Sequence, residues 1–290
     1  MTHPARPTRR STLAGLAAAL LLGAAAAPQP AQALTIVLNF VDGSTTDRNG
    51  VTTIAETFAS WGFTTLDLAG VRQATLDAVL DDYLGFPSFG SNALSPLPDG
   101  RELDINFTIS NGLTGPGNGD TEWYYMAIGD ASPNQGFLGQ ACLGCVRNSA
   151  GVATVANGTT FGSSLTDTIA GLLPLASNDQ QRIQLLAGTV AHEIGHGLGL
   201  PHPSGQLANP GESFWSIMAT GASPSLMPSS ERVKDRAFAY SEFSVLIDRV
   251  GLRDVSPIPE PGTGVVLALG LVALAWRLRA QPARPAAVAA

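Results

Sequence analysis

The segment from residue 192 to residue 202 constrains this chain more than any other part of its sequence. It reads His-Glu-Ile-Gly-His-Gly-Leu-Gly-Leu-Pro-His, with His192 and His196 four positions apart. Residues at that spacing lie on one face of an α-helix, where two imidazoles can coordinate one Zn²⁺. Gly199 can adopt a positive φ, which would end the helix and bring His202 back as a third ligand. Three protein ligands leave a fourth position for water, as in catalytic zinc sites.

The preceding residues predict the helix that carries this segment. From Ser177 to Gly197, apolar residues recur at helical spacing and cluster within about 100° of one another. These residues are Ile183, Leu186, Ala187, Val190 and Ile194. His192 and His196 fall on the opposite side. Ser177 and Gln180 predict a capping box at the start of the helix. We therefore expect one face to pack in a core while the other presents two imidazoles.

The use of histidine in the chain supports a metal site. Only four histidines occur, and apart from His3 all of them lie in this motif. Glu193 directly follows the first motif histidine, a position from which a carboxylate acts on a metal-bound water rather than as a ligand. A purely structural metal site does not need such a base.

The pattern H-E-x-x-H-x-x-G-x-x-H resembles the signature of the metzincin metalloproteases. Metzincins place a methionine turn beneath the metal, and Met218 lies sixteen positions after His202, a fitting position for that turn. The resemblance implies an α/β (α+β) domain with a metzincin-like zincin fold. Such a fold has a twisted, mostly parallel sheet with an antiparallel edge strand, a zinc helix and a Met-turn. The resemblance is specific over residues 180–252 and only general before them.

Within the metzincins, the motif is similar to those of matrixins and serralysins, and Pro203 after the third histidine is similar to serralysins. Serralysins place a tyrosine ligand two residues after the turn methionine, whereas this chain has Thr220. The sequence also lacks the calcium-binding repeats of serralysins and the Pro-Arg-Cys-Gly propeptide switch of matrixins. The subfamily therefore stays open.

The resemblance implies a zinc endopeptidase that acts on a protein or peptide. In that mechanism Zn²⁺ activates a water molecule and polarises the scissile carbonyl, and Glu193 acts as general base. The metal also stabilises the oxyanion of the tetrahedral intermediate. The substrate would lie extended along a sheet edge, as in β-augmentation.

Residues 1–33 predict an export signal. Arg6, Arg9 and Arg10 precede an apolar stretch, and Ala-Gln-Ala at residues 31–33 forms a small-residue cleavage site. Arg9 and Arg10 are also similar to a twin-arginine motif, so both the general secretory route and the twin-arginine route stay open.

The C-terminus predicts a sorting signal over residues 257–290. Pro-Glu-Pro at residues 259–261 is followed by the uncharged stretch Gly262–Trp276 and then by Arg277 and Arg279. This order resembles the PEP-CTERM signal of Gram-negative bacteria, in which an exosortase cuts near Pro-Glu-Pro and passes the protein to the cell surface. The apolar stretch is shorter than the roughly 20 residues that cross a bilayer comfortably. A plain membrane anchor is the alternative, given the basic flank.

Residues 34–256 would then form one catalytic domain, which we expect to be monomeric and which is long enough to bury a single core. The whole chain has 16 Lys+Arg against 23 Asp+Glu, a formal net charge of −7, and Lys234 is its only lysine. Without a basic stripe to neutralise phosphates, nucleic acid is not expected as a partner. Two further functions stay open: a zinc hydrolase of a non-protein substrate, and a surface interaction protein of the exopolysaccharide or biofilm layer.

Interleaved strands and helices in the body favour an α/β sheet domain. Period-two alternation and β-branched runs predict strands at Leu34–Val41, Leu103–Ser110 and Glu122–Ile128. Helical spacing predicts helices at Ile54–Trp61, Gln73–Leu84 and Ser229–Leu252, besides the metal helix.

Two weaker signals concern Cys142, Cys145 and calcium. The two cysteines form a single C-x-x-C, and the absence of a second pair argues against another zinc site. An exported chain favours a local disulfide between them. The Asp/Asn/Gly-rich loops Asp42–Asp47 and Asn118–Asp120 could hold Ca²⁺, although solvated turns have the same composition.

Overall fold

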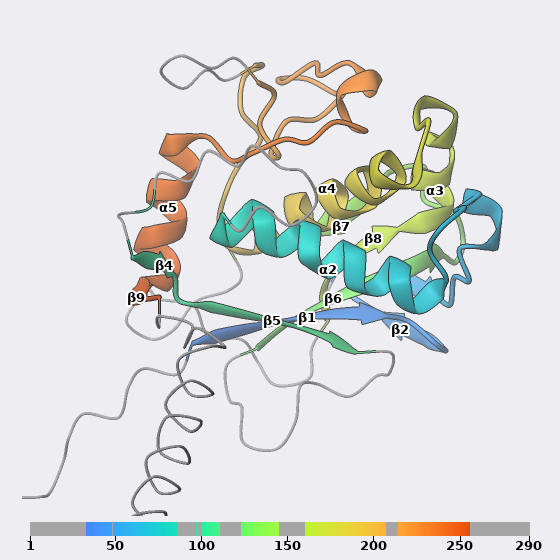
Figure 1. Cartoon of the computed structure of the whole chain (residues 1–290), viewed down its shortest axis with the longest axis horizontal. Helices are drawn as coiled ribbons and strands as arrows, with labels where there is room; N and C mark the ends of the chain where they lie inside the picture. Colours follow the sequence, from blue (N-terminus) through green and yellow to red (C-terminus); the bar gives the residue numbers. More distant parts are fainter. Residues whose placement is uncertain are drawn as a thin grey trace, which may run out of the picture.

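A mostly parallel β-sheet carries two long helices on one of its faces (Figure 1). The computed structural model describes residues 33–47, 49–85, 97, 100–110, 123–144, 160–206 and 214–255. The sheet comprises β1 (Leu34–Phe40), β2 (Ser44–Thr46), β3 (Thr52–Ile54), β5 (Ile105–Ser110), β6 (Trp123–Ala131), β7 (Gly139–Ala141) and β8 (Thr160–Leu165). A separate two-stranded sheet pairs β4 (Arg101–Leu103) with β9 (Leu252–Asp254). The α-helices are α2 (Leu68–Leu84), α3 (Thr166–Ala170), α4 (Asp179–Gly197) and α5 (Tyr240–Val250), with 3₁₀ turns η1 (Ala59–Trp61), η2 (Leu173–Leu175) and η3 (Ser229–Glu231).

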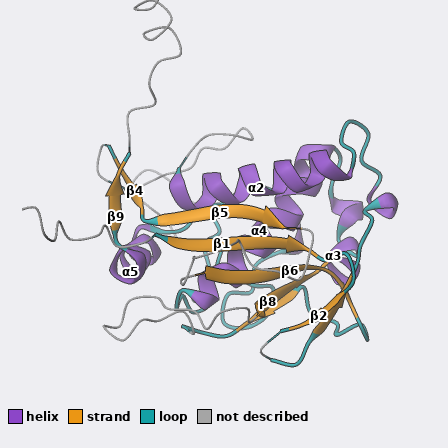
Figure 2. Ribbon diagram, turned by 90° about the horizontal axis from the view of Figure 1, so that it is seen from below, coloured by secondary structure: helices purple, strands orange, loops and turns teal. Residues whose placement is uncertain are grey.

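The sheet topology confirms the predicted α/β class with a mostly parallel sheet. Strand β1 pairs in parallel with β5 on one side and with β6 on the other, and β6 pairs in parallel with β8 (Figure 2). Strand β7 runs antiparallel to β8, and among the described strands β8 is its only partner. The hairpin of β2 and β3 joins the end of β6 in antiparallel orientation. Strand β7 therefore supplies an antiparallel edge strand.

Strand β1 is buried on both faces, as expected for a central parallel strand. Its alternate residues Leu34, Ile36, Leu38 and Phe40 join the large core shared with the helices. Val37 instead packs with Tyr125 in a separate cluster. The predicted strand Leu34–Val41 is confirmed to within one residue, and the predicted helix Gln73–Leu84 lies inside α2.

Helix α4 packs against the sheet and against α2, its neighbour on the same face (Figure 1). The five apolar residues that the sequence placed on its buried face, Ile183, Leu186, Ala187, Val190 and Ile194, are all fully buried. From α2, the Tyr83 hydroxyl donates a hydrogen bond of 2.8 Å to the Ala191 carbonyl. This bond ties α2 to α4 one residue before His192.

The predicted capping box at the start of α4 is wrong by one residue. Asn178 is the N-cap, and its side chain accepts a hydrogen bond of 2.9 Å from the Gln181 amide. Asparagine caps a helix as well as serine does, so the helix begins one residue later than expected. Ser177 instead donates from its amide and hydroxyl to the Gln181 side chain, at 2.7 and 2.9 Å.

The predicted helix at Ile54–Trp61 is wrong. Ile54 ends strand β3, where it pairs with Asp130 of β6. Only the 3₁₀ turn η1 follows, and it lies between Phe58 and Gly62, whose φ values are 60° and 70°. Left-handed residues on both sides prevent the helix from extending, and the apolar spacing reflects Phe58 and Trp61 packing edge-to-face.

The single helix predicted at Ser229–Leu252 is also wrong. The chain forms η3, then an irregular segment, and then α5. In the irregular segment Ala237 forms a parallel bridge with Ser216, and its carbonyl accepts from the Ile217 amide at 3.2 Å. This long-range pairing outweighs helical propensity.

Two predicted strands differ from the structure in their bounds. Leu103–Ser110 divides at Asp104 into β4 and β5, and the Asp104 amide donates to the Gly251 carbonyl instead of continuing the sheet. Strand β6 extends to Ala131, beyond the predicted end at Ile128.

The predicted export and sorting signals lie outside the described residues. Among the residues that are described, no helix has the length and apolar character needed to cross a bilayer.

Asp179, the first residue of α4, joins the helix to the segment before α2. Its carboxylate accepts hydrogen bonds from the amides of Thr64 and Thr65 at 2.9 and 2.7 Å, and from the Thr65 hydroxyl at 2.7 Å. Arg182 forms an ion pair with it at 3.1 Å. Burial acts to raise the pKa of Asp179, but the hydrogen bonds from Thr65 and Thr64 lower this pKa to about 2.

We expect Asp179→Asn to lower the free energy of unfolding by about 2 kcal/mol at pH 7, since hydrogen bonds to a charged group are lost. A carboxylate with a lowered folded pKa stabilises the fold above its unfolded pKa of about 3.9, and this contribution disappears as the pH falls toward 2. Urea unfolding from pH 7 to pH 2.5 should therefore show the two proteins converging. Asp248→Asn, at an exposed residue of α5, is the control. A difference independent of pH would contradict the assignment.

Candidate metal centre

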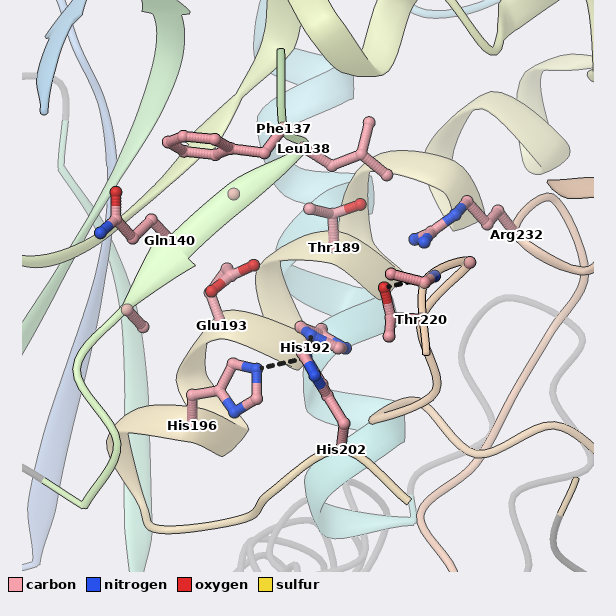
Figure 3. A pocket seen from close by; sticks show the side chains of 14 residues that line it. Phe137, Leu138, Gln140, Thr189, His192, Glu193, His196, His202, Thr220 and Arg232 are labelled. Carbon is pink, nitrogen blue, oxygen red and sulfur yellow. Dashed lines mark hydrogen bonds between the residues drawn. The ribbon is translucent and has the colours of Figure 1, made fainter. Parts of the chain in front are cut away.

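Three imidazoles meet at the C-terminal end of α4. His192 and His196 project from this helix, and His202 approaches from the turn that follows it (Figure 3). The Nε2 atom of His202 lies 3.1 Å from that of His192 and 2.9 Å from that of His196. Among the described residues, these form the only group of three or more His, Cys, Asp or Glu side chains with all ligand atoms within 4.8 Å.

Two backbone carbonyls orient the helix histidines. The Ile217 carbonyl lies 2.8 Å from Nδ1 of His192, and the Leu200 carbonyl lies 2.7 Å from Nδ1 of His196. A carbonyl oxygen can only accept a hydrogen bond, so each Nδ1 carries the proton. Each Nε2 therefore directs its lone pair toward the centre of the trio, an arrangement that is typical of metal-ligating histidines.

The geometry and the donor set fit a metal ion. In a tetrahedral zinc site with Zn–N distances of about 2.0–2.1 Å, the ligand nitrogens lie about 3.3 Å apart. The observed separations of 2.9 and 3.1 Å are close to that value. Burial lowers the pKa of all three rings, and that of His192 falls well below its ordinary value because His196 is also close. Neutral imidazoles are the form that binds zinc.

The turn after α4 brings the third histidine back. Gly199 has a φ of 102°, as the sequence predicts for a residue that ends the helix. The Gly199 amide donates to the His196 carbonyl and the Leu200 amide donates to the Gly195 carbonyl, both at 2.9 Å. These two bonds define a Schellman motif. The same turn presents the Leu200 carbonyl to the His196 ring, so it positions two ligands at once.

Met218 packs directly against the metal helix. It is fully buried, and a Cβ atom added at Gly195 would lie 2.5 Å from its Sδ atom. Gly195, which lies between the two helix histidines in sequence, therefore allows the close approach of the turn. The structure thus places Met218 beside the motif.

Ser216 and Glu242 hold the turn that contains Met218. The Ser216 hydroxyl lies 2.7 and 2.8 Å from the two carboxylate oxygens of Glu242, and it accepts a hydrogen bond of 2.9 Å from the Met218 amide. Glu242 also accepts from the Ala239 amide at 2.8 Å, at the start of α5. Helix α5 thus fixes the backbone that carries the Ile217 carbonyl.

Arg236 reaches the same backbone from the irregular segment before α5. Its Nη1 donates to the carbonyls of Ser216 and Ile217, both at 3.1 Å. A Cβ atom added at Gly188 would lie 2.8 Å from Nη2, so this glycine of α4 admits the guanidinium. The Ile217 carbonyl therefore accepts from both Arg236 and His192.

Glu193 lies between the helix and the edge strand β7. Its side chain is buried, and a Cβ atom added at Gly139 of β7 would lie 2.6 Å from its Oε1 atom. In Figure 3, Gln140 of β7 lies beyond Glu193 on the side away from Arg232. Burial raises the pKa of Glu193 to about 8, against the opposing influence of Arg232. Its carboxyl group thus has a high proton affinity next to the histidine trio.

A cavity of about 420 Å³ opens above these side chains. Strand β7 and the residues before it form one wall, α4 and the imidazoles form the floor, and the loop after Met218 forms the other wall (Figure 3). The lining residues outside α4 and the histidines are Phe137, Leu138, Gly139, Gln140, Ala141, Thr220, Gly221, Ala222 and Arg232. Thr220 also lines this cavity.

The remaining predicted residues lie outside the trio. Cys142 is disulfide-bonded, and Cys145, the only other cysteine, is outside the described residues. The adjacent Gly144 amide donates to the His196 carbonyl at 2.7 Å, so this loop docks on the end of α4.

Asp47, in the first of the two loops considered for Ca²⁺, is hydrogen-bonded within the fold. Asp47 accepts hydrogen bonds from the amides of Asn49 and Val51 at 2.8 and 2.9 Å, and from the Ser163 hydroxyl at 3.0 Å. Its oxygens therefore stabilise a turn. The second candidate loop, Asn118–Asp120, lies outside the described residues.

Arg232 and Arg236 belong to the site although the sequence does not single them out. Both fall within Ser229–Leu252, where the apolar spacing predicts one long helix and no site residue. The sequence does contain a signal for them. Two arginines four positions apart follow Met218 in a chain whose formal net charge is negative.

The comparisons with known proteins identify the C-terminal segment. Residues 257–280 match the family model of the PEP-CTERM protein-sorting motif. This match confirms the predicted motif and indicates an exported protein whose C-terminus an exosortase recognises. No curated protein matches the chain.

Three solved structures share a distant similarity with the chain. Archaemetzincin from Methanopyrus kandleri aligns with a TM-score of 0.37 and 14% identity, over 77% of this chain and 98% of that one. The GM1-bound form of the ECX AB5 holotoxin gives 0.33 and 12%, over 81% and 88%. A chaperone–substrate complex gives 0.29 and 15%, over 76% and 34%. At these TM-scores the similarities do not assign a fold family.

We expect Arg236→Met to weaken zinc binding by about 10- to 100-fold, because the Ile217 carbonyl that orients His192 loses its second donor. Competition with a fluorescent chelator measures the affinity, and metal-free unfolding shows whether the variant folds. Arg236→Lys retains the charge but not the planar guanidinium, so its zinc affinity should lie between those of the unmodified protein and of Arg236→Met. Lys234→Met, at an exposed neighbour, is the control for charge. Unchanged zinc affinity in a folded Arg236→Met protein would contradict this role.

Proposed function

We propose that this protein is an exported zinc-dependent endopeptidase. One observation carries the proposal: the Nε2 atoms of His192 and His196 lie within 3.1 Å of that of His202, at the floor of an open cavity and beside the buried side chain of Glu193. Structural zinc sites are closed by four protein ligands, whereas this site offers three imidazoles and an adjacent acid.

In the proposed reaction, different residues of the site would bind the metal, transfer the proton and orient the ligands. When bound by His192, His196 and His202, Zn²⁺ supplies a Lewis acid and a water molecule of lowered pKa. Glu193 accepts a proton at its carboxylate and delivers it to the leaving amine. Because Gly139 and β7 pack against it, Glu193 is held in place and shielded from bulk water. The carbonyls of Ile217 and Leu200 keep the histidines in the ligating tautomer.

The edge strand β7 favours a peptide substrate. Among the described strands it pairs only with β8, so its other edge presents backbone donors and acceptors along the cavity wall. An extended chain can add to such an edge through main-chain hydrogen bonds. A backbone bound there would pass directly over Glu193, because Gly139 of β7 touches that side chain. These contacts favour proteolysis over a non-protein substrate or a purely adhesive role.

We expect the zinc-loaded protein to cleave an unstructured protein, and Glu193→Gln to lower kcat by at least about 100-fold while zinc stays bound stoichiometrically. A zinc chelator should abolish cleavage and added zinc should restore it. The measurements are fluorogenic cleavage and elemental analysis of the same samples. Asp248→Asn, which also removes one carboxylate but at an exposed residue of α5, is the control.

Two results would contradict this function. One is full activity of Glu193→Gln, and the other is cleavage that resists removal of the metal. Turnover of a polysaccharide by a protein that leaves every peptide intact would favour the alternative, a zinc hydrolase of the exopolysaccharide layer.

We further propose that an exosortase cuts near Pro259–Pro261 and passes the protein to the surface of a Gram-negative cell, where the 257–280 segment has served as a transient membrane anchor. Mass spectrometry of the surface-associated protein should find a C-terminus at these residues. An intact terminus at Ala290 would instead indicate a plain membrane anchor.

A further inference from the structure

Arg232 brings a cation into the cavity from the wall opposite β7. It follows η3, and its guanidinium lies across the cavity from Gln140, with the histidine trio between and below them (Figure 3). The cavity therefore has an acid, Glu193, near β7 and a guanidinium on the far side.

Within the part of the chain that the structure describes, the guanidinium of Arg232 forms neither an ion pair nor a side-chain hydrogen bond. Arg101, Arg182, Lys234 and Arg253 each pair there with a carboxylate, whereas Arg72, Arg232, Arg236 and Arg249 do not. Arg236 donates to two backbone carbonyls instead, and of the other three only Arg232 lines the cavity. Burial lowers the pKa of Arg232 and Glu193 only partly offsets this. A half-buried cation that has lost water without gaining a partner is stabilised by an anion that enters its cavity.

The surroundings of Arg232 leave room for such an anion. Gly221 lies beside the guanidinium without crowding it, since even an added Cβ atom there would be 3.9 Å from the Nη2 atom, an ordinary contact distance. The neighbouring Thr189 hydroxyl already donates to the Leu185 carbonyl at 3.0 Å. Glu193 is the only acid among the residues that line the cavity. The planar fork of a guanidinium matches the two oxygens of a carboxylate.

We propose that Arg232 binds a carboxylate of the peptide substrate and so determines which peptides are cleaved. The carboxylate belongs either to an Asp or Glu side chain next to the scissile bond or to the C-terminus of a short peptide. This inference rests on the proposed peptidase function, because it selects among the substrates of the same site. Arg232 is a specificity-determining residue, distinct from the proton-transferring Glu193.

Two peptide panels separate the two sources of carboxylate. In the first, both ends are blocked and a single Glu is moved through the sequence, each peptide paired with its Gln analogue. In the second, peptides with a free C-terminus are paired with their carboxamides. With the zinc-loaded full-length protein, one panel should show kcat/KM about 10- to 100-fold higher for the acid, the range expected for a charge-assisted bidentate pair.

Variants at Arg232 test whether this residue causes the preference for the acidic peptides over their amides. Arg232→Met should bring the acid-to-amide ratio close to one, and Arg232→Glu should shift the preference to Lys at the same position. Arg101→Met removes a cation from the β4–β9 pair and should leave the ratio unchanged. Zinc stoichiometry and thermal unfolding confirm that each variant is folded and loaded. If Arg232→Met fails to fold, Arg232→Lys, which keeps the charge, should retain part of the preference.

A binding measurement separates this inference from the proposed function. Zinc-loaded Glu193→Gln should bind the labelled acidic peptide more tightly than its amide, by fluorescence anisotropy, and Arg232→Met in that background should remove the difference. Peptides cleaved at equal rates as acids and amides, or a preference that survives Arg232→Met, would overturn the inference alone. If no peptide is cleaved although acidic peptides bind through Arg232, the peptidase proposal fails and the carboxylate site stands.

Discussion

Two hydrogen bonds to backbone carbonyls set the orientation of the helix histidines, on which the candidate metal centre depends. By accepting the Nδ1 protons of His192 and His196, the Ile217 and Leu200 carbonyls leave both Nε2 lone pairs directed toward the centre of the trio. Much of the structure nearby holds these two oxygens in place. The Schellman turn presents Leu200, while Arg236 and the Ser216–Glu242 contact fix the backbone around Ile217. Without such partners an imidazole can rotate or change tautomer, and its affinity for metal falls.

The cavity is built asymmetrically around this centre. On one side, β7 approaches so closely that only glycine fits opposite Glu193, which removes the acid from water and offers a strand edge to an extended chain. On the other side, Arg232 contributes a cation that the fold leaves without an ion pair among the described residues. Under the proposed function, a peptide in this cavity would lie between the proton acceptor Glu193 and the guanidinium of Arg232.

Local sequence patterns predict the structure correctly where neighbouring residues decide the conformation. The buried face of α4, the positive φ of Gly199 and the β1 strand all follow from local periodicity or from glycine. The same patterns predict the wrong conformation where a distant contact competes. Ile54 pairs with β6 instead of starting a helix, and Ala237 bridges to Ser216 instead of continuing one. Both segments have apolar residues at helical spacing, but pairing with a distant segment holds Ile54 and Ala237 in extended structure.

The sequence by itself determined the donor atoms, their helical spacing and the returning turn, because an eleven-residue motif needs only local backbone geometry to bring its histidines near one another. The sequence also determined the sorting motif at the C-terminus, because that motif is defined by the order of its residues along the chain. Tertiary structure alone decided which carbonyls orient the rings, which strand lies against Glu193 and which arginine faces the cavity. These contacts join segments that lie far apart in the chain, so their partners are set by how the sheet, α4 and the segment before α5 pack together.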